Sequence, residues 1–113
     1  MNLFDPMQYM VAEATQYDRA VVALRALVYV IENPKSRVSE KAMRFIEKMI
    51  GSTGLGSTHC RVTEPQVKWL FSVLFKNKSR WPEDVRARLR ELDWVSDLET
   101  EYGWELFQNR QQH

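Results

Sequence analysis

The sequence of 113 residues is poor in the residues that build loops and disulfides. Its four glycines and four prolines leave little material for long loops. One cysteine cannot form an internal disulfide, and no charged segment followed by an apolar stretch opens the chain, so we expect a reducing, cytoplasmic location. The apolar stretch from Ala20 to Ile31 has only 12 residues and contains Arg25, which is too short and too charged to span a bilayer. We therefore expect no membrane partner.

Side chains for enzymatic chemistry are equally scarce. The two histidines are His59, beside the single cysteine Cys60, and His113. This set does not supply a nucleophile, a base and an orienting group, and two adjacent side chains do not complete a metal site of three or four ligands. We predict that the protein is not an enzyme and uses neither a cofactor nor a metal. A small enzyme acting through His59 and Cys60 is kept as a third hypothesis.

The residues that are present favour one all-α domain over 1–113. Apolar residues make up 44% of the chain, enough to fill a core, and no segment alternates with the strand period of two. Asp5 and Pro6 are typical of a helix start, and apolar residues then recur every three or four positions, so we predict a long helix over about 6–32. The apolar residues of this heptad pattern must be covered by other helices of the chain or by another subunit. The helix is therefore a candidate homodimer interface.

Capping residues divide the rest of the chain into shorter helices. Ser39 is a suitable N-cap, and Thr63 with Gln66 forms a capping box. Gly51 is a typical left-handed helix end, and the glycine-rich residues after it predict a flexible loop over 51–62. The fold class is thus a single-domain bundle of five to six helices around the long one, the others being about 40–50, 64–76, 82–92 and one or two short helices in 93–108.

The formal net charge of +1 hides a strong segregation of charge along the chain. Residues 1–34 carry a net charge of −2, residues 35–90 carry +8, and residues 91–113 carry −5. A basic cluster of this kind attracts phosphate backbones, so we predict a partner that is nucleic acid or a nucleic-acid-handling complex. The cations predicted to contact phosphates are Lys41, Arg44, Lys48, Lys76, Lys78, Arg80, Arg86, Arg88 and Arg90.

Two other interpretations of these cations stay open. Charged helix faces often only solubilise a protein, and helix-spaced ion pairs such as Glu40 with Arg44 contribute little. The helices over 64–76 and 82–92, with the break at 77–81, also allow a helix-turn-helix motif whose second helix presents arginines to DNA.

The four tryptophans offer a second candidate site. Trp81 and Trp94 are the best placed for partial exposure and for contact with cations, so we predict that they bind a partner, and we expect two of the four tryptophans in the core. The alternative function is a protein–protein inhibitor or adaptor, such as a phage anti-defence protein, that uses these aromatics and the charged patches. One continuous basic patch over the helices 40–50 and 82–92 favours nucleic acid, whereas an acidic tail lying across those cations favours the adaptor.

The segment over 39–75 combines two capped helix starts with apolar residues at helical spacing. These are Ser39-Glu40-Lys41 followed by Phe45-Ile46, and Thr63-Glu64-Pro65-Gln66 followed by Trp69-Leu70. The pairing resembles the helix pairs of small all-helical accessory proteins encoded by phages and other mobile elements. The resemblance implies an accessory role in DNA metabolism or in blocking a host machine, and it assigns no functional residue.

Overall fold

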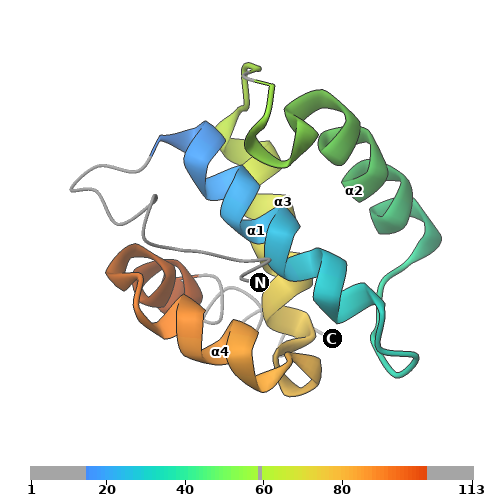
Figure 1. Ribbon diagram of the computed structural model, residues 1–113, viewed down its shortest axis with the longest axis vertical. Coiled ribbons are helices and arrows are strands. Elements are labelled where there is room, and N and C mark those ends of the chain that lie inside the picture. The colour runs from blue at the N-terminus through green and yellow to red at the C-terminus, as the bar shows by residue number, and fades with distance from the viewer. Residues whose placement is uncertain (1–14, 59, 102–113) are drawn as a thin grey trace, which may run out of the picture.

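The computed structural model describes residues 15–58 and 60–101, and these residues form helices joined by short turns (Figure 1). No strand occurs within them, so the predicted all-α single-domain bundle is confirmed. A further helical segment covers 93–101. The elements before it are α1 (Gln16–Ile31), α2 (Glu40–Thr53), the 3₁₀ turn η2 (Gly54–Gly56), α3 (Glu64–Lys76), the 3₁₀ turn η3 (Lys78–Arg80) and α4 (Glu83–Arg90).

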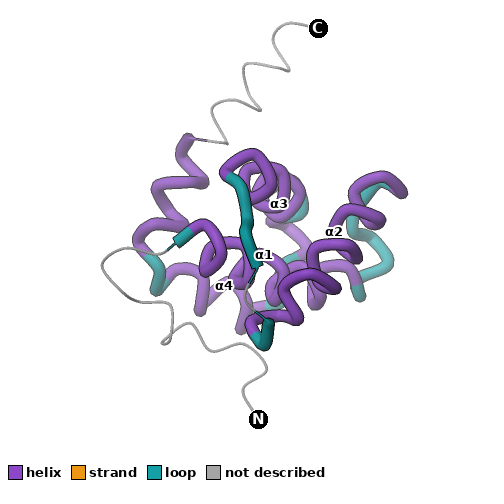
Figure 2. The backbone as a smooth tube through the Cα atoms, turned by 90° about the horizontal axis from the view of Figure 1, so that it is seen from above, coloured by secondary structure: helices purple, strands orange, loops and turns teal. Residues whose placement is uncertain are grey.

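Helix α1 runs through the middle of the bundle, with α2 on one side of it and α4 on the other (Figures 1 and 2). Other helices of the same chain therefore cover α1. This is one of the two alternatives that the sequence left open, the other being a second subunit. The residues of α1 with no exposed surface are Ala20, Val21, Val22, Ala23, Leu24, Ala26, Leu27 and Val30.

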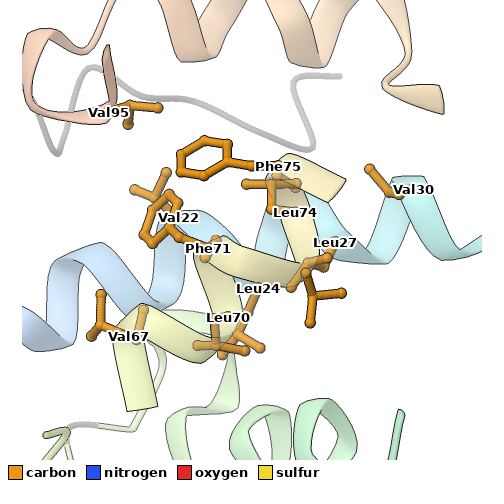
Figure 3. Close-up of a cluster of buried hydrophobic side chains, with 14 of the residues drawn as sticks. Val22, Leu24, Leu27, Val30, Val67, Leu70, Phe71, Leu74, Phe75 and Val95 are labelled. Carbon is orange, nitrogen blue, oxygen red and sulfur yellow. The ribbon is translucent and has the colours of Figure 1, made fainter. Parts of the chain in front are cut away.

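The core lies mainly between α1 and α3 (Figure 3). Leu24 and Leu27 of α1 meet Leu70 and Phe71 of α3, and none of these four side chains is exposed. Val95, from the helical segment over 93–101, belongs to the same buried cluster and lies above Val22 and Phe71 in the view of Figure 3. Each large apolar side chain buried in this way contributes roughly 1.5–3 kcal/mol.

The start of α1 differs from the sequence prediction. Thr15 is extended, with φ −73° and ψ 167°, and its side-chain oxygen accepts a hydrogen bond from the backbone nitrogen of Asp18 at 3.1 Å. Asp18 Oδ2 in turn accepts from the Thr15 nitrogen at 3.1 Å, so the two residues form a capping box. The predicted continuous helix over 6–32 is therefore wrong at residue 15. The heptad spacing of apolar residues runs through this position without a break, so the spacing gave no sign of the cap. The predicted start at Asp5 and Pro6 lies outside the described residues.

The end of α2 also differs from the prediction. Gly51 lies inside the helix, and the left-handed cap is Gly54, with a φ of 55°. The Thr53 hydroxyl donates to the Met49 carbonyl at 2.8 Å and accepts from the Leu55 nitrogen at 3.3 Å, which supports the extra turn. The predicted helix over 40–50 is therefore three residues too short.

The predicted loop over 51–62 is wrong for its first half, which is the end of α2 and the turn η2. Two side chains of α1 hold η2 and the residues directly after it. Arg25 donates to the Leu55 carbonyl from Nη2 at 2.6 Å and from Nε at 3.1 Å. The Tyr17 hydroxyl donates to the Thr58 carbonyl at 2.9 Å. Arg25, the one polar residue in the apolar stretch of α1, thus fixes a distant turn.

The second half of the chain follows its local sequence more closely. Helix α3 has the predicted bounds, and Thr63 and Gln66 form the predicted capping box. Helix α4 is shorter than the predicted 82–92, because the chain turns after Arg90 before the segment over 93–101 begins. Among the residues that the structure describes, no helix is both long enough and apolar enough to cross a membrane.

Candidate functional site

The nine predicted cations do not form one patch. Lys41, Arg44 and Lys48 belong to α2, and α2 lies on the opposite side of α1 from α4 (Figures 1 and 2). Lys76 ends α3. The remaining five, Lys78, Arg80, Arg86, Arg88 and Arg90, belong to η3 and α4. The continuous basic patch over α2 and α4 that would favour nucleic acid is therefore not formed. The cations near α2 form one group, and those of η3 and α4 form a second.

The first group surrounds a pair of stacked aromatic rings that joins α2 to α3. The rings of Phe45 and Trp69 lie 4.1 Å apart between centroids with planes 18° apart, and both residues are only half-buried. Lys41 and Lys48 stand one helical turn before and after Phe45, and both are exposed. Lys76, also exposed, follows Trp69 by two turns on the same face of α3. We call these five residues the aromatic–lysine face.

A buried asparagine sets the geometry of this face. Asn77, at the end of α3, has no exposed surface and bonds both backbone groups of Arg37, which lies in the segment leading into α2. The start of α2, with Lys41, is thereby held near the end of α3, with Lys76. Arg37 is exposed at the same end and adds a cation that sequence reasoning missed. No local pattern links residues 40 positions apart, so only the Asn77 contact reveals it.

The carboxylates of α2 lie away from the aromatic–lysine face. Helical spacing places Glu40 and Glu47 on the flank opposite Phe45. Glu40 pairs with Arg44 at 2.6 Å, and both side chains are largely exposed, at 82% and 74%. An exposed pair of this kind contributes at most about 1 kcal/mol, so Arg44 is a weak contributor to either a fold or a site.

Three cations of the second group, Lys78, Arg80 and Arg86, are already in contact with protein groups. Arg86 Nη2 donates to the Lys78 carbonyl at 2.5 Å, and the Arg86 guanidinium carbon lies 5.6 Å from the centre of the Trp81 ring. Lys78 Nζ lies 5.9 Å from the same ring centre and forms an ion pair with Glu99. Arg80 donates to the Ser79 hydroxyl at 2.6 Å. One carboxylate of the acidic segment after α4, Glu99, thus pairs with a cation of η3.

The two candidate tryptophans have different environments. Trp81 is buried, with 8% of its surface exposed, and its indole nitrogen donates to the Leu74 carbonyl at 2.8 Å. The prediction that Trp81 is exposed for partner binding is therefore wrong, because η3 turns the ring back onto α3. Its predicted contact with cations is present. Trp94 is half-buried and lies 5.5 Å from the guanidinium carbon of Arg19, so its cation comes from α1.

The remaining sequence candidates add little. Cys60 is half-buried, and His59 and Trp104 lie outside the described residues. Within 15–58 and 60–101, no three histidine, cysteine or acidic side chains come together as a group able to hold a metal ion. No protein family, curated protein or solved structure matches the chain. The aromatic–lysine face is therefore the candidate site that the geometry itself supports.

Proposed function

We propose that this protein is a non-enzymatic, cytoplasmic binding protein that holds single-stranded nucleic acid on the aromatic–lysine face. The observation that carries the proposal is the half-buried Phe45–Trp69 stack with lysines one or two turns away on each helix. Bases stack on aromatic rings without strong sequence preference, and lysines beside the rings neutralise the backbone. This restricts the contacts predicted from the sequence to Lys41, Lys48 and Lys76, with Arg37 added at the same end.

The test is fluorescence anisotropy with labelled single-stranded DNA and RNA and with the matching duplexes, at low salt. We expect the single strands to bind more tightly, with an affinity that falls as salt rises. The double variant Lys41→Gln/Lys48→Gln should lower the slope of log affinity against log salt by roughly one per lysine. Phe45→Leu, which keeps an apolar side chain but removes the ring face, should weaken binding by about fivefold or more.

The matched control is Arg90→Gln, on α4 and on the opposite side of α1. It should leave the binding of single strands unchanged. Equal losses in the control and in the lysine variant would contradict the aromatic–lysine face. Absence of binding to every probe at low salt would end the proposal in its direct form.

The second candidate function is the protein–protein inhibitor or adaptor. The observation that favours it is the ion pair between Lys78 and Glu99, which sets acidic residues against the cations of the turn before α4. Pull-down from a host lysate with and without nuclease separates the two functions. A partner retained after nuclease treatment, with no binding to oligonucleotides, supports the adaptor and the accessory role implied by the resemblance of 39–75.

The homodimer through the first helix stays a prediction. Of its heptad positions within α1, Val21 and Leu24 are fully buried by the same chain, whereas Tyr17, Val28 and Ile31 are half-buried. A second copy would therefore have to pack on these three partly exposed side chains. Sedimentation at high protein concentration measures it directly.

A further inference from the structure

A small pocket lies between α4 and the helical segment over 93–101, and it belongs to neither the aromatic–lysine face nor its proposed function. Its volume is about 140 Å³. Trp81 is among its apolar lining, and its polar lining consists of Lys78, Arg86, Arg90, Ser96 and Glu99. We propose that this pocket binds the doubly charged phosphoryl group of a phosphate monoester.

The charge of the pocket matches that group. Three cationic side chains face one carboxylate, which leaves an excess of two positive charges. A phosphate monoester carries about −1.5 to −2 at neutral pH, whereas a carboxylate or a phosphodiester carries a single negative charge. A doubly charged anion therefore offsets this excess while Glu99 stays in place, and three cations face it if Glu99 is displaced, so in either case the pocket favours two negative charges over one.

The arginines are arranged to receive an anion. Arg86 is held against Trp81 and by its bond to the Lys78 carbonyl, so little side-chain freedom is lost when it binds a ligand. Arg90 lies one turn further along α4 and is exposed, and its side chain forms no ion pair or hydrogen bond with any residue within 15–58 and 60–101. A guanidinium group presents two parallel N–H donors that suit phosphate oxygens. The guanidinium N–H groups of Arg90 are thus available to bind an anion.

In the structure, the carboxylate of Glu99 occupies the position at Lys78 that we assign to the phosphoryl group. Its carboxylate pairs with Lys78 inside the pocket lining. An incoming phosphoryl group can replace this carboxylate at Lys78 while it also reaches Arg90 and the hydroxyl of Ser96. The volume is well below the roughly 300–1,000 Å³ of sites that enclose a whole small molecule. The pocket therefore accepts the phosphoryl group and the atoms next to it, and the rest of the ligand stays outside.

The experiment is an NMR titration of the full chain with inorganic phosphate at about pH 8, where phosphate is mostly a dianion. Acetate at equal ionic strength serves as the singly charged comparison. We expect saturable amide shifts confined to residues 78–99 with phosphate and weaker ones with acetate. Arg90→Gln should lower the phosphate affinity by about tenfold, because a charge-assisted hydrogen bond is lost. Glu99→Gln should raise it by up to about fivefold, because the competing carboxylate is gone.

Lys35→Gln, at an exposed position in the turn between α1 and α2 and outside both proposed sites, is the control for general loss of charge and should leave phosphate binding unchanged. Absence of saturable shifts, equal binding of acetate, or the same loss in Lys35→Gln and Arg90→Gln each overturns the pocket. Because Arg90 and Glu99 are exposed or half-buried, these variants should keep the fold, which the unchanged spectrum of the core verifies. Failure here leaves the aromatic–lysine face untouched, because that face is tested with other residues and other ligands.

Discussion

Asn77 and Arg37 are joined by a pair of hydrogen bonds that closes the segment between α1 and α2 against the end of α3. Asn77 Oδ1 accepts from the Arg37 nitrogen at 2.5 Å, and Asn77 Nδ2 donates to the Arg37 carbonyl at 3.0 Å. The same amide nitrogen donates to the Val73 carbonyl at 2.9 Å. One buried side chain therefore ends α3 and also sets where α2 begins.

Replacement of this amide should be costly. Asn77→Ala removes the side-chain partner of the buried Val73 carbonyl and of both part-buried backbone groups of Arg37, and a buried group left without a partner costs about 1–3 kcal/mol. We expect a loss of roughly 2–4 kcal/mol in the free energy of unfolding, measured by chemical denaturation. Asn33→Ala is the control, because the Asn33 side chain makes only a local bond to Lys35 nitrogen at 2.9 Å. Similar losses in the two variants would contradict the bridging role.

The two glycines at the end of α2 should respond in opposite directions to alanine. At Gly51 an added Cβ has nothing within 4 Å and the residue is helical, so Gly51→Ala should stabilise the protein by about 0.5–1 kcal/mol. At Gly54 the φ is +55° and a Cβ lies 2.4 Å from the Ser57 hydroxyl oxygen, so Gly54→Ala should destabilise it by about 1–2 kcal/mol. Thermal unfolding of both variants checks which glycine is the cap. A destabilising Gly51→Ala would restore the sequence prediction.

Arg25 should control the stability of the segment after α2. Arg25→Met keeps the apolar stem of the side chain but removes both hydrogen bonds to the Leu55 carbonyl. We expect faster hydrogen exchange at the amides of Ser57 and Thr58, whose bonds to Gly54 and Thr53 depend on this turn. Arg25→Lys retains the charge and one donor, so its exchange rates should fall between those of Arg25→Met and the parent. Unchanged exchange in both variants would show that the turn holds itself.

Tyr17 should make the protein sensitive to alkaline pH. Partial burial, followed by the nearby Cys60 and Asp18, raises the pKa of the Tyr17 phenol above its ordinary 10.0, with Arg25 acting in the opposite direction. A pKa that is higher in the folded state means that the stabilisation is present below pH 10.0 and is lost as the pH rises through the folded value. The ionised phenol also can no longer donate to the Thr58 carbonyl.

Tyr17→Phe isolates this effect. At neutral pH the variant should be about 0.5–1.5 kcal/mol less stable, because the hydroxyl that donates to the Thr58 carbonyl, and more weakly to the Thr53 carbonyl, is lost. The difference in unfolding free energy between the two proteins should shrink as the pH is raised from about 9 to about 11. Every other titratable group is common to the two proteins, so its contribution cancels in the comparison. A constant difference across this range would show that Tyr17 ionisation is not linked to folding.

Local patterns predicted the helices well wherever a cap and its partner are close in sequence. Ser39 and the pair of Thr63 with Gln66 cap α2 and α3 as expected. The prediction failed at Thr15, where a capping box interrupts an unbroken apolar spacing, and at Gly51, where the first available glycine is not the one that ends the helix. In both cases two local signals conflicted, and periodicity alone did not decide between them.

The candidate site was less accessible to sequence reasoning. Lys41, Lys48 and Lys76 were identified as cations, but Phe45 and Trp69 were noted only as apolar residues at helical spacing, and Arg37 was not among the predicted contacts. Trp81 was expected at the surface because it stands beside a proline, yet its indole donates to Leu74 and the ring is buried. The exposure of an aromatic ring depends on what packs over it, and that partner lies in another element.

The sequence by itself determined the all-α class, the capped starts of α2 and α3 and the segregation of charge, because each arises from residues within a few positions of one another or from composition. Only the tertiary structure decided which cations lie together. Two contacts between residues 30 and 40 positions apart position α2: Arg25 with Leu55 holds the turn after α2 against α1, and Asn77 with Arg37 holds the segment before α2 against the end of α3. Because α2 and α4 lie on opposite sides of α1, cations that are neighbours in the sequence belong to helices that are apart in the fold (Figures 1 and 2).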